Sequence, residues 1–215
     1  MENVHIVLGA PKKELIKPLI KNNGIVIGVD RGAFLALKEG IKVDVALGDF
    51  DSISAKEKEM IKQEIKEVLN YPAEKDDTDT EIALLYTLDK YKNANVYIYN
   101  WYGGRIDHLY SILFVVLQER FKQLVSHLHF VSKSNNVSHY LPGTYDIEKM
   151  NGMDYLSYIL LTEVEDLTLN EVKYPLNQAS FAQPMALISN EFINDKATFS
   201  FKKGMIAVVQ SRDSN

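Results

Sequence analysis

The sequence predicts an α/β protein, with an N-terminal, mostly parallel sheet flanked by helices and a C-terminal antiparallel β-sandwich or barrel. Before about residue 140, continuously apolar runs alternate with segments of helical spacing, which is typical of a parallel sheet covered on both faces. Beyond that point the helical spacing stops and short strand-like runs follow, which is typical of an antiparallel sandwich or barrel. We therefore expect two domains, at residues 1–140 and 141–215.

Strands of the first domain are expected where short apolar runs end at glycine or at a polar residue. They cover residues 4–9, 25–29, 43–47, 95–101 and 128–131, with a further short strand at 68–71. Helices are expected where apolar residues recur every three or four positions. They run from Pro11 toward Gly24 and over residues 33–38, 54–66, 78–88 and 107–120. Thr78 and Glu81 fit a capping box, and the nearly all-apolar segment 107–120 predicts a buried central helix.

The second domain begins after the turn at Pro142-Gly143. Short strands are expected at residues 155–161, 167–169, 197–201 and 205–209. The last two are joined by Lys202-Lys203-Gly204, which suits a hairpin.

Composition limits the kind of protein this is. The hydrophobic content of 46% and charged content of 25% are ordinary for a soluble globular protein. No apolar run is long enough to cross a bilayer and no signal-peptide layout is present, so we expect a cytoplasmic protein without a membrane partner. The net charge of −5 disfavours a nucleic-acid partner. The absence of cysteine excludes disulfides, thiolate zinc sites and cysteine nucleophiles.

Acidic or glycine-rich turns follow the strands at residues 30–32, 48–52, 76–79 and 103–108. The carboxyl ends of parallel strands share one edge of a sheet, so these turns should converge. Asp49, Asp51 and Asp79 would then lie close together, repel one another and attract a cation. Their hard oxygen ligands suit Mg²⁺. The alternative for the turn at 48–52 is an ordinary Asp/Ser-rich turn that caps the next helix.

The turn at residues 103–108 offers a phosphate site. Gly103 and Gly104 allow backbone amides to approach an anion, and Arg105 presents a planar set of donors. A metal, a phosphate site and fixed positions are what phosphoryl transfer requires. Structural alternatives stay open: Arg105 could pair with Asp107, and His108 could simply pack or cap.

Two further acidic positions have structural alternatives. Asp30 could cap its helix, and Asp77 fits a solvated loop charge better than a functional group.

These motifs, in this order and spacing, resemble the thiamine pyrophosphokinase family. In the first domain they are Asp30-x-Gly-Ala, Gly48-Asp49-Phe50-Asp51-Ser52, Lys75-Asp76-x-Thr78-Asp79 and Gly104-Arg105-x-Asp107-His108. In the second they are Tyr174-Pro175-Leu176-Asn177 and Ile188-Ser189-Asn190-Glu191-Phe192. The resemblance extends from about Ile25 to Val209.

The resemblance implies an enzyme that transfers the pyrophosphoryl group of ATP to thiamine, giving thiamine diphosphate and AMP. It implies Mg²⁺ held by Asp49, Asp51 and Asp79, and an α/β domain that binds ATP and the metal. It implies a homodimer whose site lies where one subunit's α/β domain meets the partner's thiamine-binding β-domain. The resemblance implies nucleotide or phosphate contacts at Asp30, Asp76, Thr78, Arg105 and His108. It implies that Asp107 is a catalytic residue near the reacting hydroxyl, where it could assist deprotonation, and that thiamine is contacted by Tyr174, Ser189 and Asn190.

The chain departs from the family pattern in two places. Arg31 stands where a small residue is usual, and residues 178–188 lack the glycines expected there. Two other functions remain as alternatives. One is a pyrophosphokinase for another alcohol, such as a hydroxymethyl pterin, and the other is a non-catalytic sensor of a nucleotide or of thiamine diphosphate. Three metal-binding carboxylates facing a phosphate turn favour an enzyme over a sensor.

Overall fold

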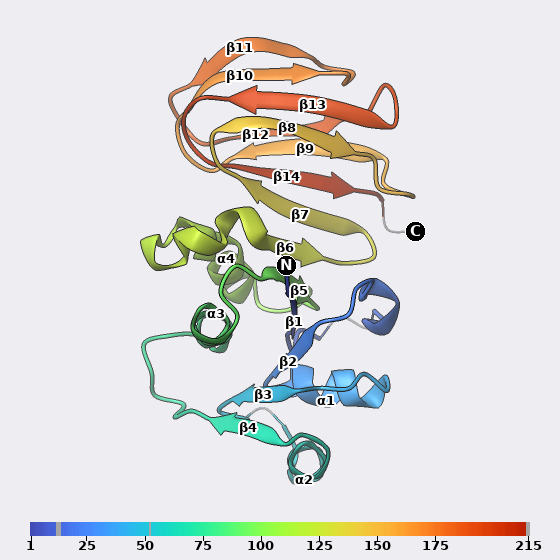
Figure 1. Ribbon diagram of the computed structural model, residues 1–215, viewed down its shortest axis with the longest axis vertical. Coiled ribbons are helices and arrows are strands. Elements are labelled where there is room, and N and C mark those ends of the chain that lie inside the picture. The colour runs from blue at the N-terminus through green and yellow to red at the C-terminus, as the bar shows by residue number, and fades with distance from the viewer. Residues whose placement is uncertain (12–13, 52, 214–215) are drawn as a thin grey trace. The chain divides into compact units, whose positions relative to one another are not determined.

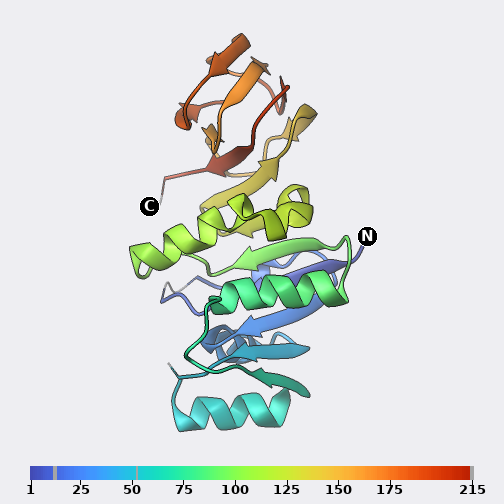
Figure 2. The same cartoon turned by 90° about the vertical axis from the view of Figure 1, so that its left-hand side faces the viewer.

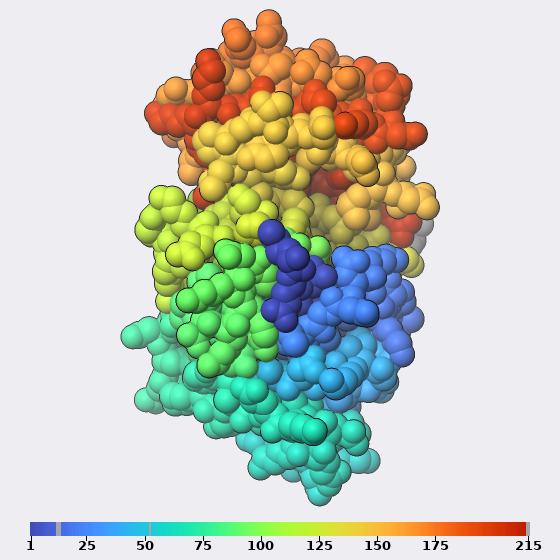
Figure 3. Space-filling model, viewed as in Figure 1, coloured from blue at the N-terminus to red at the C-terminus, as the bar shows by residue number. Residues whose placement is uncertain are grey.

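The structure is a computed structural model that describes residues 1–11, 14–51 and 53–213. The chain divides into two compact units, Met1–Ser132 and Lys133–Asn215. The sequence predicts the domain boundary between residues 140 and 141, whereas in the structure strand β7 (Asn135–Tyr140) is part of the second unit. Met1 is 81% exposed, and the N-terminal residues (dark blue) lie at the surface in Figure 3.

The first unit contains the predicted parallel sheet, with strand order β6-β5-β1-β2-β3-β4. The strands are β1 (Asn3–Val7), β2 (Ile25–Val29), β3 (Val45–Gly48), β4 (Glu67–Asn70), β5 (Asn95–Tyr99) and β6 (Leu128–Val131). All neighbouring pairs are parallel, and Val29 pairs with Leu47 while Val7 pairs with Tyr99. The strands therefore end level, and the residues that follow them gather at one edge.

Helices cover both faces of this sheet, as the buried apolar strands require. They are α1 (Arg31–Lys38), α2 (Ala55–Glu64), α3 (Asp79–Lys90) and α4 (Ile106–Phe114). Helices α1 and α3 lie on opposite faces (Figure 1), and α3 lies in front of the strands in Figure 2, with its axis roughly along their direction. The capping box predicted for α3 is confirmed: the Glu81 N–H donates to Thr78 Oγ1 at 3.3 Å, and the Thr78 N–H donates to Glu81 Oε2 at 2.8 Å.

The helix predicted from Pro11 toward Gly24 is wrong over its described part. That part holds only the short 3₁₀ turn η1 (Lys17–Leu19), and residues 12–13 lie outside the described chain. Pro18 explains the difference, because proline lacks an N–H and its ring clashes with the preceding helical turn. The N–H groups of Ile16 and Lys17 instead donate to Glu39 Oε2, at 2.8 and 2.9 Å.

The single helix predicted over residues 107–120 is also wrong. Helix α4 ends at Phe114 and is followed by the 3₁₀ segments η2 (Val115–Leu117) and η3 (Glu119–His127). Gln118 between them is extended, with φ −79° and ψ 125°. The segment is not buried all round either, since Tyr110 is 54% and Phe114 is 51% exposed. The apolar residues there form an exposed surface as well as a buried one.

The second unit is the predicted antiparallel β structure, built as two sheets of order β12-β9-β14-β7 and β11-β10-β13-β8. Besides β7, the strands are β8 (Gly143–Glu148), β9 (Tyr155–Leu160), β10 (Val164–Asn170), β11 (Leu176–Phe181), β12 (Met185–Asn190), β13 (Lys196–Phe201) and β14 (Ile206–Ser211). Phe199 at the centre is 1% exposed and contacts the rings of Tyr140, Tyr145 and Tyr158, which come from both sheets. The unit is therefore a sandwich.

Among the helices in the described part of the chain, none is long and apolar enough to cross a bilayer.

Replacing Phe199 with alanine should destabilise the second unit. The side chain is buried among rings, so its removal leaves a cavity and should lower the free energy of unfolding by about 3–5 kcal/mol. The measurement is urea unfolding followed by far-UV circular dichroism. Trp101, the single tryptophan, lies in the first unit, so its fluorescence reports on that unit separately. Phe199→Leu should cost less, and equal losses for the two variants would contradict a packing role.

Candidate active site

The carboxyl edge of the parallel sheet borders a pocket of about 730 Å³. Its walls come from the residues after β1, β2, β3 and β5 and from the starts of α3 and α4. Most of the predicted site residues of the first unit line it, namely Asp30, Asp49, Asp51, Asp76, Thr78, Asp79, Arg105 and His108. Asp107 is not in the lining, and Ser52 lies outside the described residues.

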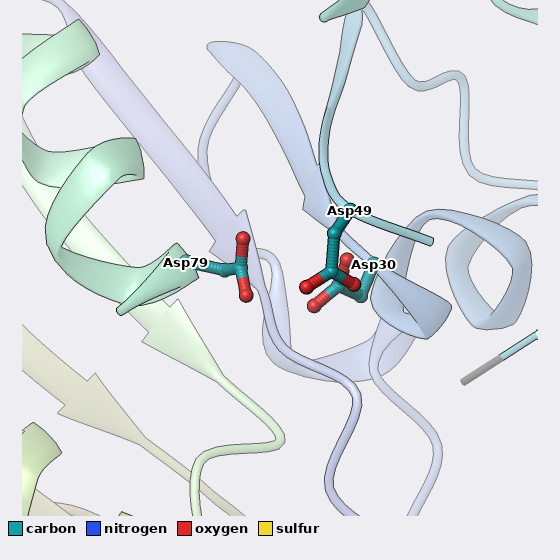
Figure 4. Close-up of side chains that lie close together, drawn as sticks. All are labelled: Asp30, Asp49 and Asp79. Atoms are coloured by element: carbon teal, nitrogen blue, oxygen red, sulfur yellow. The ribbon is translucent and has the colours of Figure 1, made fainter. Parts of the chain in front are cut away.

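Three carboxylates meet in this pocket. Asp30 follows β2, Asp49 follows β3 and Asp79 is the first residue of α3, and one oxygen of each lies within 4.8 Å of the others (Figure 4). The sequence predicts that Asp51 joins Asp49 and Asp79, but in the structure the third carboxylate near them is that of Asp30. Asp51 instead contacts Asp49 through its backbone, since its N–H donates to Asp49 Oδ1 at 3.0 Å.

The chain after β3 is shaped to bring Asp30 and Asp49 together. Gly48 has φ +145°, and a Cβ atom there would lie 1.9 Å from Asp30 Oδ1, so only glycine fits. Phe50, at φ 55°, is 3% exposed and packs in the core. Its N–H donates to Asp30 Oδ1 at 3.1 Å. The turn is thus anchored by Phe50 while Asp49 faces the pocket.

Burial and neighbouring charge change the protonation of these groups. Burial raises the pKa of Asp30 to about 7, and the charges of Asp79 and Asp49 add to the effect. Burial acts in the same direction on Asp49, but the Asp51 N–H and the Lys75 ammonium outweigh it and lower the pKa of Asp49. Near neutral pH the cluster therefore holds a proton that it can release.

Lys75 is the cation within this cluster. Its Nζ lies 3.3 Å from Asp49 Oδ2 and 3.0 Å from Asp79 Oδ1, and it donates to the Pro72 carbonyl at 3.0 Å. The side chain is only 13% exposed. Although burial opposes it, contact with Asp79 and Asp49 raises the pKa of Lys75. Sequence reasoning gave Lys75 no role; its position four residues before Asp79 was the available signal.

A second network, also missed from the sequence, fixes the start of α3. The Arg120 guanidinium lies 2.6 Å from Asp77 Oδ1 and 2.9 Å from Glu81 Oε1, and its Nε donates to Gln118 Oε1 at 2.8 Å. Glu81 is the capping-box residue of α3, so this network holds the loop and the helix that carry Asp79. Asp77 is therefore an ion-pair partner rather than a solvated charge.

The glycine-rich turn presents Arg105 at the start of α4. Arg105 Nε donates to Asp107 Oδ1 at 3.1 Å, and the two side chains are 73% and 60% exposed. This contact with Arg105 lowers the pKa of Asp107 to about 2. A carboxylate with that pKa is a poor proton acceptor at neutral pH. The His108 N–H also donates to Asp107 Oδ1, at 3.0 Å, and both contacts lie at the N-terminal end of α4.

The three predicted thiamine contacts lie in the second unit. Tyr174 is 58% exposed, and Ser189 is exposed at φ 60° with its N–H donating to Ser157 Oγ at 3.1 Å. Asn190 is 5% exposed. Its Oδ1 accepts from the Tyr174 N–H at 2.9 Å, and its Nδ2 donates to the Tyr174 carbonyl at 3.0 Å. Asn190 therefore fixes the backbone that presents the Tyr174 ring.

The donor set of the acidic trio fits a divalent cation. Three carboxylates within reach of one point supply hard oxygen ligands, which suit Mg²⁺ and Ca²⁺ and not the softer metals. The crevice at the carboxyl edge of the sheet is where open α/β proteins bind their ligands. Fold and site together define an α/β protein with an acidic ligand pocket at that edge.

Comparison with known proteins narrows the class. Residues 16–128 match the profile described as "Thiamin pyrophosphokinase, catalytic domain", and residues 144–206 match "Thiamin pyrophosphokinase, vitamin B1 binding domain". The chain is 37% identical to the thiamine pyrophosphokinase of Bacillus subtilis, over 99% of this chain and 100% of that protein.

Solved structures agree. A thiamin pyrophosphokinase family protein from Enterococcus faecalis has a TM-score of 0.91 at 36% identity, over 99% of this chain and 100% of that chain. The thiamin pyrophosphokinase of Geobacillus thermodenitrificans has a TM-score of 0.81 at 31% identity, over 99% and 98%. The chain therefore belongs to the thiamine pyrophosphokinase family, whose members are enzymes that make thiamine diphosphate by pyrophosphoryl transfer.

The raised pKa of Asp30 predicts how stability depends on pH in metal-free protein. The pKa is about 7 in the folded state, against 3.8 ordinarily. Folding therefore takes up a proton between these values, and stability should fall as the pH rises from about 4 to about 7. Asp30→Asn removes the ionisation and should flatten that fall. The measurement is the urea midpoint of unfolding of the wild type and of Asp30→Asn, in chelator, at about pH 5 and about pH 8. An equal change of midpoint between the two pH values in both proteins would contradict the prediction.

Proposed function

We propose that the protein transfers the pyrophosphoryl group of ATP to thiamine, giving thiamine diphosphate and AMP, with Mg²⁺ as the metal. The observation that carries the proposal is the meeting of Asp30, Asp49 and Asp79 in a pocket that is also lined by Arg105 of the glycine-rich turn. Such a site offers a metal position and a phosphate position side by side, which phosphoryl transfer requires. Membership of the family supplies the acceptor, thiamine.

In this proposal Asp49 and Asp79 hold the cation, with Asp30 as a third ligand. Asp51, two residues after Asp49 and in the lining of the same pocket, remains a predicted ligand. When bound, Mg²⁺ would neutralise charge on the transferred phosphates. Asp76, Thr78 and His108 line the same pocket and are proposed to contact the nucleotide.

Arg105 is proposed to bind phosphate, which requires it to share or leave its contact with Asp107. In the reaction the hydroxyethyl oxygen of thiamine attacks the β-phosphorus of ATP, the bond from that phosphorus to the α,β-bridging oxygen breaks, and AMP leaves. The hydroxyl proton must be lost as the new bond forms. Asp107 is unsuited to accept it while paired with Arg105, because its pKa is about 2.

The second unit is proposed to bind thiamine. The exposed Tyr174 ring suits a cationic thiazolium or a flat pyrimidine. Ser189, which is exposed in the same unit, is proposed as a second thiamine contact. Asn190, the next residue, acts by fixing the Tyr174 backbone. We place the enzyme in the cytoplasm, with no nucleic-acid partner.

We further propose a homodimer in which the first unit of one subunit meets the second unit of its partner. Large apolar side chains at helical spacing are exposed on α4 and η2, where Ile106, Tyr110, Phe114 and Leu117 are 69%, 54%, 51% and 42% exposed. In the second unit Met185, Ile188 and Ile193 are 47%, 66% and 66% exposed. Grouped exposed apolar residues of this kind mark interaction surfaces.

The test of the reaction is AMP release from ATP with Mg²⁺ and thiamine, with a hydroxymethyl pterin as the rival acceptor. Thiamine should be the acceptor used, and turnover with the pterin alone would overturn the proposal. Asp49→Asn should lower turnover at least about a hundredfold while far-UV circular dichroism stays unchanged, because it removes a metal ligand. Asp89→Asn, at a 72% exposed carboxylate of α3, is the matched control and should keep the wild-type rate.

The test of the dimer is Phe114→Glu. A charge in the middle of the exposed apolar stripe should convert the dimer to a monomer in sedimentation velocity and should abolish turnover. Leu15→Glu introduces the same charge at a 69% exposed apolar position elsewhere in the first unit and should leave the dimer intact. A wild-type protein that is monomeric at assay concentration would sink the proposal.

A further inference from the structure

The Lys75 side chain lies between two carboxylates of the candidate metal site, where its positive charge competes with a metal ion. Its ammonium bridges Asp49 and Asp79, at 3.3 and 3.0 Å, inside the same trio that is suited to a divalent cation. A surface lysine would have many alternative positions, but this side chain is 13% exposed and also donates to the Pro72 carbonyl at 3.0 Å. It is therefore held on the carboxylates that the cation needs.

We propose that Lys75 is a tethered counter-cation, which neutralises the acidic trio in the metal-free protein and is transferred to the ligand's phosphate when a divalent cation takes its place. This rests on the proposed function only in that the ligand is a polyphosphate bound with a divalent cation. The identity of the acceptor does not enter.

The first half of the proposal follows from charge. An ammonium and a divalent cation held together between Asp49 and Asp79 at these distances would repel each other strongly. In this proposal, binding of the metal therefore breaks the ion pairs of Lys75. The lysine makes metal binding weaker than it would be to three free carboxylates, and in return it lowers their mutual repulsion in the folded protein.

The second half follows from where Lys75 can go. It lies in the pocket lining, in the loop between β4 and α3, and its flexible four-carbon chain can turn without moving the backbone. A displaced ammonium that is partly buried needs a new anion. The phosphate of a ligand in this pocket is the anion that arrives together with the metal.

The proposal predicts effects of opposite sign on two ligands. Lys75→Gln keeps most of the side-chain length and removes the charge. By isothermal titration calorimetry without nucleotide, it should bind Mg²⁺ about five- to tenfold more tightly than wild type, because the competing cation is gone. With saturating Mg²⁺, it should bind inorganic triphosphate about five- to tenfold more weakly, because a phosphate partner is gone.

Lys62→Gln is the matched control, since Lys62 is an exposed lysine of α2 in the same unit, and it should leave both affinities unchanged. Weaker binding of both Mg²⁺ and triphosphate by Lys75→Gln would mean that Lys75 only holds the loop in place, and would overturn the proposal. Tighter Mg²⁺ binding with unchanged triphosphate binding would overturn the transfer to phosphate. Both titrations omit thiamine, so they can succeed even where the proposed acceptor is wrong.

Discussion

Charge repulsion among three carboxylates is the constraint on which the first unit depends. Asp30, Asp49 and Asp79 come from the ends of two strands and the start of a helix, and their oxygens meet within 4.8 Å. Such a group would destabilise the folded chain if all three were ionised and unpaired. Two features offset this: the Lys75 ammonium, and a proton on Asp30, whose pKa is about 7. Both are positive charges that a divalent cation can replace.

The backbone at this edge is also under strain. Asp30, Phe50 and Asn100 follow β2, β3 and β5, and their φ angles are 47°, 55° and 54°. A residue other than glycine costs of the order of 1–3 kcal/mol at such angles, so neighbouring contacts must hold it there. The Phe50 N–H donates to Asp30, and the Asn100 amide donates to the carbonyls of Leu8 and Ala10 at 2.8 Å each. The hydrogen bonds that hold these residues at strained angles thus tie the strand ends to one another and stiffen the floor of the pocket.

The features that could be predicted from the sequence are those decided over short distances or by topology. Apolar runs gave the strands, the Thr78 capping box gave the start of α3, and a parallel sheet brought the acidic turns to one edge. What could not be predicted depends on partners far apart in the chain. Arg120 reaches Asp77, in the loop before α3, from 43 residues away, and Glu39 accepts from a segment 22 and 23 residues earlier. Asp30 lies beside Asp49 and Asp79 because Gly48 leaves room for its side chain, and this depends on packing that no local sequence pattern shows.

The charges of the pocket explain why phosphate and metal should enter together. Each cation that is described in the lining is already paired with a carboxylate: Arg31 with Glu57, Lys75 with Asp49 and Asp79, and Arg105 with Asp107. A free polyphosphate would therefore meet an acidic surface whose donors are occupied, and would be repelled. A polyphosphate that carries a divalent cation reverses this, because the cation draws the carboxylates away from Lys75. If the substrate is the proposed polyphosphate, the acidity of the site would exclude its free form and would select its metal-bound form.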